Sequence, residues 1–403
     1  MNLTQSIALL AATLTASAAA TTTEERQYYL QKMDLVTFIT PSEEASYYWQ
    51  NMSEVLPTSV IARQGLIKPL ERDLKSTIAS TQYQGTSLNS MLTGEDAPLE
   101  ALMVIKEGKI TFEHFNINRN QKHVWMSNAK TLAGLMVAQL EQDELIDVQK
   151  PLSQYLPQVK GTAWQNIKVI DVLNQQSGLD IEENDITRYN PRHYVSQFFQ
   201  SEIYGDDYLT NLLKPPAVKS PGEAFEYSSL NTQMLALLIS TVTGQRLSEV
   251  LQQRIWAPAG MTSDAILALS PTGHEIIHGL ISSNLEDMMR YGMLYTPSWH
   301  ETAKTPVVTP QILNKIRGSI TSGTFSQGDS YYRFKAITGE EPLGSSYQWD
   351  QIWADGDMYK SGMRGQGIYV SPDKDLVIGW FSKRDAKINA AAFARQYAKQ
   401  LTL

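Results

Sequence analysis

Cysteine is absent from this chain of 403 residues, and histidine occurs only six times. The absence of cysteine excludes disulfide bonds, thiol catalysis, thiolate-ligated zinc and lipid attachment through an N-terminal cysteine. The histidines show no HExxH or similar ligand spacing; they are His114, His123, His193, His274, His278 and His300. A metal site would therefore have to be built from carboxylates. We expect neither a metal nor another cofactor.

Long basic and long apolar runs are also missing. The 34 lysines and arginines are outnumbered by 42 acidic residues, and the net charge is −8. Because nucleic-acid binding needs concentrated positive charge, this balance argues against a nucleic-acid partner. No segment reaches the length of a transmembrane helix, so we expect no stable membrane anchor. With 42% hydrophobic residues, the composition is that of an ordinary globular protein.

The N-terminus carries an alanine-rich apolar run from Ile7 to Ala20, which ends in the small-residue patterns Ala16-Ser17-Ala18 and Ala18-Ala19-Ala20. Such a run resembles the core and cleavage site of a secretory signal. The first six residues contain no lysine or arginine, and the alternative is a disordered N-terminal tail. We predict a signal peptide over residues 1–20 and a periplasmic or secreted protein.

Strand patterns occur at both ends of the remaining chain. A hairpin is predicted from the runs 101–106 and 109–115, which flank the turn at Glu107-Gly108. Three more strands are predicted at 347–352, 367–370 and 376–381. Helical patterns are found at 42–56, 127–140, 230–242, 247–256 and 388–401.

This distribution predicts an α+β fold in which one antiparallel sheet is built from both ends of the chain. The mostly helical middle region would be an insertion packed against one side of that sheet. We predict a single domain over 21–403, with a sheet part of about 42–147 and 316–403. The helical part would cover about 148–315.

The stretch around Ser127 is the main candidate for chemistry. Ser127 and Lys130 stand three residues apart at the start of an apolar helical run, so they share one helix face. At the positive end of the helix dipole, this pair can provide a nucleophilic serine without histidine. The alternative is an exposed lysine on the first turn of a core helix. A second SxxK pattern, Ser371 to Lys374, contains Pro372 between two strands, which forbids a helical layout.

Two further elements can join the serine–lysine pair. Tyr227-Ser228-Ser229 ends a loop and leads into a helix, where the tyrosine oxygen can approach the pair. The alternative is a helix N-cap beside a packed tyrosine, and Tyr194-Val195-Ser196 has a similar shape. Lys360-Ser361-Gly362 stands before the C-terminal hairpin, where glycine lets a substrate approach the strand edge closely. Its alternative is a glycine-rich strand start with exposed cations.

These elements, in this order, resemble the SxxK and KTG signatures of the serine β-lactamase and penicillin-binding-protein superfamily. The resemblance covers most of the chain, from about Trp49 to the final helix. It is closest to the class C-like branch of esterases, β-lactamase-related proteins and aminohexanoate-oligomer hydrolases. Asp357-Met358-Tyr359 and the run from Gly365 to Val370 favour the last group.

The resemblance implies a role for each matching residue. Ser127 would attack a carbonyl and form an acyl-enzyme, and Lys130, with a lowered pKa, would accept or relay the proton. Tyr227 would share that proton and deliver it to the leaving group. The backbone N–H groups of Ser127 and Met363 would form the oxyanion hole.

The substrate-binding residues implied by the resemblance are Ser229, Lys360, Ser361, Gly362 and Arg364. The class C pattern has asparagine two residues after the tyrosine, where this chain has Ser229, so an amide side chain of a β-lactam is held less well. Lys360 matches the lysine that meets a substrate carboxylate, and Arg364 could serve the same anion.

The sequence therefore predicts a serine hydrolase that cleaves amide or ester bonds of small substrates. One alternative is a D-alanyl-D-alanine carboxypeptidase or β-lactamase that acts on cell-wall peptides or β-lactams. Another is a non-catalytic binding member of the same superfamily. The oligomeric state and the choice between amide and ester stay open at this point.

Overall fold

The computed structural model describes residues 21–83, 85–94, 97–205, 207–384 and 387–401. The predicted signal peptide at residues 1–20 lies outside this range. Within the range, no helix has both the length and the apolar character needed to span a bilayer.

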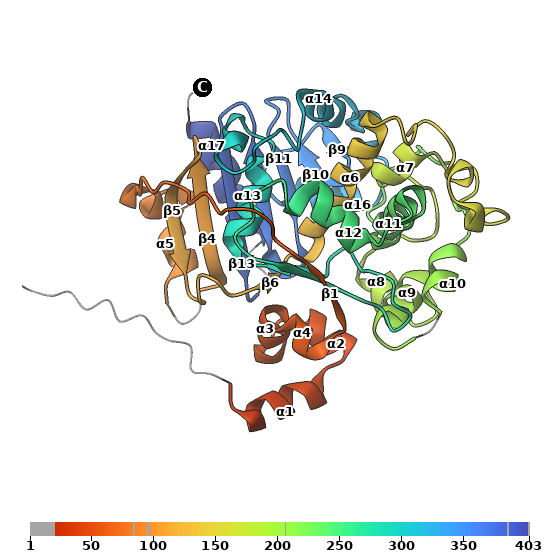
Figure 1. Ribbon diagram of the computed structural model, residues 1–403, viewed down its shortest axis with the longest axis horizontal. Helices are drawn as coiled ribbons and strands as arrows, with labels where there is room; N and C mark the ends of the chain where they lie inside the picture. Colours follow the sequence, from red (N-terminus) through yellow and green to blue (C-terminus); the bar gives the residue numbers. More distant parts are fainter. Residues whose placement is uncertain (1–20, 84, 95–96, 206, 385–386, 402–403) are drawn as a thin grey trace, which may run out of the picture.

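The centre of the molecule is an antiparallel sheet, in which seven of the described strands are ordered β5-β4-β13-β12-β11-β10-β9. Its strands are β4 (Leu99–Lys106), β5 (Lys109–Phe115), β9 (Gly344–Ser346), β10 (Trp349–Ile352), β11 (Met358–Ser361), β12 (Gly367–Ser371) and β13 (Leu376–Ser382). β4 from the first part of the chain pairs directly with β13 from the last part (Figure 1). The predicted α+β fold with a sheet built from both ends is therefore confirmed.

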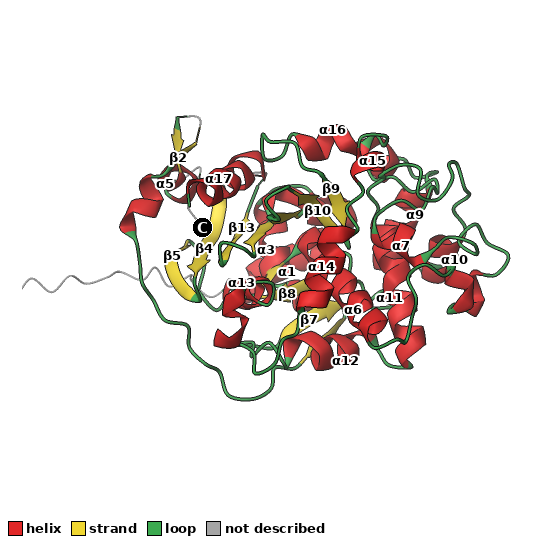
Figure 2. Cartoon of the chain, turned by 90° about the horizontal axis from the view of Figure 1, so that it is seen from above, coloured by secondary structure: helices red, strands yellow, loops and turns green. Residues whose placement is uncertain are grey.

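Apolar residues continue without interruption from Ala101 to Ile105 of β4 because both faces of the sheet are covered. Leu102 and Val104 face the cluster that contains the C-terminal helix, whereas Met103 and Ile105 face the larger core on the other side. Figure 2 shows α17 on one side of the sheet and α13 on the other. The strand alternation thus divides the core into two layers.

The described α-helices are α1 (Thr23–Lys32), α2 (Leu35–Ile39), α3 (Glu43–Gln50), α4 (Met52–Val55), α5 (Leu88–Leu92), α6 (Lys130–Gln142), α7 (Val169–Leu173), α8 (Asp185–Tyr189), α9 (Tyr194–Ile203), α10 (Tyr208–Leu213), α11 (Ser229–Thr243), α12 (Leu247–Leu251), α13 (Leu285–Met293), α14 (Pro310–Gly318), α15 (Ser322–Phe325), α16 (Ser330–Lys335) and α17 (Lys387–Gln400). The helix predicted at 42–56 is divided into α3 and α4 at Asn51. The helix predicted at 247–256 begins as α12 and continues as a π-helix from Gln252 to Trp256.

A second small sheet, ordered β1-β7-β8-β6, was not predicted. Its strands are β1 (Thr58–Ile61), β6 (His123–Val124), β7 (Ala265–Ala268) and β8 (Ile281–Ser283). Strands of two to four residues are too short to show a period of two, so no alternating pattern predicts them. A further pair, β2 (Gln82–Tyr83) with β3 (Thr86–Ser87), forms a separate hairpin.

The turn before β10 connects the sheet to the helical region. Tyr347 and Gln348 have φ values of 47° and 71°, so the strand predicted from residue 347 begins only at Trp349. The Gln348 side-chain oxygen accepts hydrogen bonds from Gln175 (3.0 Å) and Thr232 (2.7 Å). This turn therefore holds α7 and α11 against the sheet.

Replacing Gly134 by alanine should destabilise the fold, because α6 packs directly on this turn. A Cβ at Gly134 would lie 2.2 Å from the Tyr347 carbonyl oxygen, which is backbone and moves only with the turn. Overpacking of this kind typically costs about 1–3 kcal/mol, more than the roughly 1 kcal/mol gained in helix propensity. Urea unfolding should show a lower midpoint. Gly318→Ala is the matched control, since its Cβ meets no atom within 4 Å, and its midpoint should not fall.

Candidate active site

Ser127 lies at the point where the small sheet meets α6. After β6, the Trp125 N–H donates to the Ile281 carbonyl of β8 (2.9 Å), and Met126 takes a φ of 51°. This sharp turn leads into the 3-10 helix η2 (Met126–Ala129), which α6 continues. The hydroxyl of Ser127 faces a cavity of about 260 Å³. Positions three residues apart superpose in a 3-10 helix, so Lys130 follows on the same face, as the spacing predicted.

Lys130 is fully buried beneath this cavity. Its ammonium donates to the Ser229 hydroxyl (2.7 Å) and to the His278 carbonyl (2.9 Å), and it lies 5.3 Å from the centre of the Tyr227 ring. Burial lowers the pKa of Lys130 to about 7; the charge of Glu183 acts in the opposite direction, and that of Lys360 adds to the lowering. A lysine with this pKa can hold or release a proton near neutral pH.

Tyr227 is the side chain that contacts Ser127 directly. Burial raises the pKa of Tyr227 well above its usual value, and the nearby charges of Asp350 and Glu183 add to this. A hydrogen bond from Ser127 acts in the opposite direction. Tyr227 therefore stays protonated in the pH range in which Lys130 loses its proton.

Ser229 supports this pair as well as lining the cavity. Ser228 caps α11 by accepting from the Leu230 N–H (3.2 Å), so the N-cap considered as an alternative does exist next to Tyr227. The Ser229 hydroxyl accepts from Lys130, and its backbone N–H donates to Glu183. A role of Ser229 in binding substrate stays a prediction.

Glu183 is a buried acid that no motif in the sequence identifies as a site residue. Burial would raise its pKa, but the charges of Lys130 and Arg188 outweigh burial and hold the pKa below its ordinary value. Arg188 lies 3.4 Å from its carboxylate. The charge of this carboxylate favours the protonated form of Lys130 and limits how far burial lowers the lysine pKa.

Lys360 and Ser361 are held by a second unpredicted acid, Asp350 of β10. The Lys360 ammonium is fully buried and paired with Asp350, whose other oxygen accepts from the Ser361 N–H (2.9 Å) and hydroxyl (2.6 Å). Burial lowers the pKa of Lys360, and Asp350 opposes this. Ser361 lines the cavity, whereas Lys360 lies behind it and contacts the Tyr227 ring at 4.7 Å. Contact of Lys360 with a substrate carboxylate stays a prediction, and the geometry favours a supporting role.

Gly362 lets the end of β11 lie directly against Trp125 and the start of η2. A Cβ there would lie 2.8 Å from the Asn128 amide and 3.0 Å from the Trp125 carbonyl. The next residues, Met363 and Arg364, line the same cavity as Ser127. The close approach thus brings together the segments that contain Ser127 and Met363, whose backbone N–H groups are predicted to form the oxyanion hole.

Other polar groups complete the cavity. Glu202 and His278 lie 2.6 Å apart. Burial raises the pKa of Glu202 and lowers that of His278, so both groups favour their uncharged forms. Arg333 lies 5.2 Å from the Tyr227 ring and donates to the Glu183 carbonyl at 2.8 Å. Among the residues described, no cluster of three or more His, Asp or Glu side chains is arranged to hold a metal ion.

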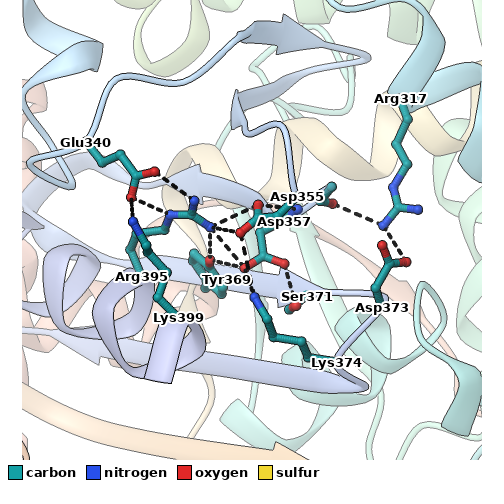
Figure 3. A network of polar contacts seen from close by, with 11 residues as sticks. Arg317, Glu340, Asp355, Asp357, Tyr369, Ser371, Asp373, Lys374, Arg395 and Lys399 are labelled. Atoms are coloured by element: carbon teal, nitrogen blue, oxygen red, sulfur yellow. Dashed lines mark hydrogen bonds and ion pairs between the residues drawn. The ribbon is translucent and has the colours of Figure 1, made fainter. Parts of the chain in front are cut away.

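The second SxxK pattern is part of a structural network (Figure 3). Ser371 donates to Asp357, and the Lys374 ammonium lies 3.4 Å from the same carboxylate. Arg395 of α17 reaches Asp357 at 3.1 Å, which ties the C-terminal helix to the sheet. The hydroxyl of Ser371 is fully occupied on a carboxylate and does not line the cavity.

Ser371→Ala should therefore lower stability and leave the active site intact. Removing one hydrogen-bond donor from a buried carboxylate typically costs about 1–3 kcal/mol. We expect a lower melting temperature with unchanged labelling by a serine-directed fluorophosphonate probe. Loss of labelling in this folded variant would mean that the wrong SxxK serine had been chosen.

Comparisons with known proteins identify relatives of this chain by sequence and by fold. The family model described as β-lactamase matches residues 93–403. A 6-aminohexanoate-dimer hydrolase from Paenarthrobacter ureafaciens is 25% identical over 341 residues, which are 81% of this chain and 82% of that protein. A Bacillus anthracis structure assigned as a 6-aminohexanoate-dimer hydrolase superposes with a TM-score of 0.70 at 20% identity, covering 90% of this chain and 95% of that one. A class C β-lactamase from Rhodobacter sphaeroides shares the fold with a TM-score of 0.51 at 14% identity, covering 75% and 94%.

Proposed function

Since the chain belongs to the β-lactamase family of hydrolases, we propose that it cleaves amide or ester bonds of small substrates through an acyl-enzyme on Ser127. The observation that carries this proposal is the position of Lys130, with a pKa of about 7, at 5.3 Å from the centre of the Tyr227 ring, while Tyr227 and Ser127 line one cavity. In this proposal, Ser127 is the nucleophile, Lys130 the base and Tyr227 the proton donor.

In the proposed reaction, Ser127 Oγ attacks the substrate carbonyl carbon and its proton passes through Tyr227 to Lys130. The backbone N–H groups of Ser127 and Met363 stabilise the oxyanion, where one donor typically contributes about 10²–10³ in rate. The tetrahedral intermediate then collapses, and Tyr227 delivers the proton to the leaving group. Water, activated by the Tyr227/Lys130 pair, releases the acyl group and restores Ser127.

The substrate class favoured here is a linear amide or ester. Similarity to 6-aminohexanoate-dimer hydrolases supports this choice, and so does the serine at position 229 in place of asparagine. The burial of Lys360 against Asp350 leaves its ammonium less available for the carboxylate of a β-lactam. Export to the periplasm or the medium remains our proposal from the apolar run at residues 7–20.

A substrate panel tests this proposal. Steady-state rates should be measured with p-nitrophenyl esters of short acids, with short linear amides and with nitrocefin. We expect turnover of the esters or linear amides at rates well above that of nitrocefin. Faster turnover of nitrocefin would favour the β-lactamase alternative, and no turnover together with no covalent adduct would favour a non-catalytic binding protein.

A further inference from the structure

An apolar wall of the cavity comes from parts of the chain far from the catalytic motifs. α2 contributes Leu35, Phe38 and Ile39, and α9 contributes Phe199 and Ile203. The residues of α2 precede residue 93, where the match to the family model begins. The α2 side of this wall is therefore built by a segment outside the region that defines the family.

Phe38 and Ile39 of the apolar wall do not pack in the same hydrophobic cluster as Tyr227. They pack in one cluster with Met126, the residue before Ser127. Tyr227 packs with Phe334 in a separate cluster on the side of α17. Ser127 follows Met126 and interacts with Tyr227, so it stands between these two clusters.

α2 is fixed at both ends to groups that surround the site. Its first N–H, on Leu35, donates to the Tyr204 hydroxyl at the end of α9 (2.7 Å). Its last carbonyl, on Ile39, accepts from Arg364 Nε (2.8 Å). Arg364 follows Met363, so α2 is attached to the turn that carries the proposed oxyanion donor. Such anchoring makes α2 a rigid part of the site.

We propose that α2 and the wall around Phe38 form the acyl pocket, which takes an aliphatic acyl chain of the substrate. This inference rests on the proposed function, because it assigns the two sides of the scissile bond. The leaving group must lie near its proton donor, Tyr227, and the carbonyl oxygen near the N–H groups of Ser127 and Met363. The remaining substituent of the carbonyl carbon is the acyl chain, which then extends along the hydrophobic cluster that contains Phe38 and Ile39.

The dependence of kcat/KM on the length of the acyl chain measures the depth of this pocket. Each methylene buried in an apolar site increases kcat/KM about fourfold until the pocket is full. With p-nitrophenyl esters of unbranched acids from acetate to decanoate, kcat/KM of the wild type should rise to an optimum and then fall. The leaving group is the same throughout, so the profile reports only the acyl side.

Variants at Phe38 should move that optimum. Phe38→Ala and the milder Phe38→Leu enlarge the pocket, and the ratio of kcat/KM for the longest ester to that for acetate should increase about 10-fold in the first. Phe38→Trp should move the optimum to shorter acids. Val36→Ala is the matched control, because Val36 lies on the same helix and is 54% exposed, and its profile should match the wild type.

The outcomes separate the pocket from the proposed function. Hydrolysis of the acetate ester by every variant shows that the acyl-enzyme chemistry is intact. If the Phe38 variants then change all esters by one common factor, α2 is only a structural support and the pocket assignment is overturned. An equal shift in Val36→Ala would also overturn it, whereas a shift confined to the Phe38 variants supports it.

Discussion

Ser127→Ala should lower kcat/KM for any hydrolysed substrate by about 10⁴-fold or more, the scale typical of losing a serine nucleophile. Ser127 is half-buried, and its hydroxyl interacts with Tyr227. Alanine therefore removes the attacking oxygen without leaving a cavity or a buried charge. Steady-state kinetics with the best ester or amide of the panel, together with circular dichroism, measures the effect.

Ser371→Ala provides the comparison for this experiment, because it removes the serine of the other SxxK pattern. Its rates should stay within about twofold of the wild type, since Ser371 contacts Asp357 and not the cavity. Substantial activity in folded Ser127→Ala would contradict the assignment of the nucleophile. Equal losses in both variants would point to a common structural defect.

Lys130→Met should lower kcat by about 10²–10⁴-fold, the range for removing a positioned general base. Methionine keeps most of the buried volume and removes the ammonium that bonds to Ser229 and His278. In the wild type, the base is the neutral amine, which predominates above its pKa of about 7. The value of kcat/KM should therefore rise with pH through about 7 and level off at higher pH.

Glu183→Gln tests whether Lys130 is the group that titrates. The carboxylate of Glu183 raises the pKa of Lys130, so its neutralisation should lower that pKa and move the rise in kcat/KM to lower pH. The amide oxygen of glutamine can still accept from the Ser229 N–H. A profile that does not shift, or one that shifts to higher pH, would contradict the role of Lys130 as the base.

The main sheet could be predicted because each of its long strands carries its own pattern. The runs at 101–105 and 376–381 contain no charged or polar side chain, since both faces of the sheet are covered. The shared helix face of Ser127 and Lys130 could also be predicted, because positions three apart lie on one face in both 3-10 and α-helices. The left-handed φ of Met126 could not be predicted. It occurs next to the hydrogen bond of Trp125 with Ile281 of β8, a partner that is distant in the sequence.

Asp350 shows why the partners of the motif residues could not be predicted. In the pairing of β10 with β11, Gln351 lies opposite Tyr359, so Asp350 comes to lie beside Lys360. That register depends on how β10 pairs with β11 across the irregular turn between them. In the sequence, Asp350 is only one of several polar residues in a predicted strand. Glu183 lies outside regular structure, and no periodic pattern connects it with Lys130.

The most direct test of the central claim is the site of covalent modification. The full chain should be treated with a fluorophosphonate probe, digested and mapped by mass spectrometry, in the wild type and in Ser127→Ala. The account predicts one adduct, on the peptide that contains Ser127, and its absence in the variant. A folded wild type that carries no adduct, or an adduct on Ser371 or another serine, would contradict it.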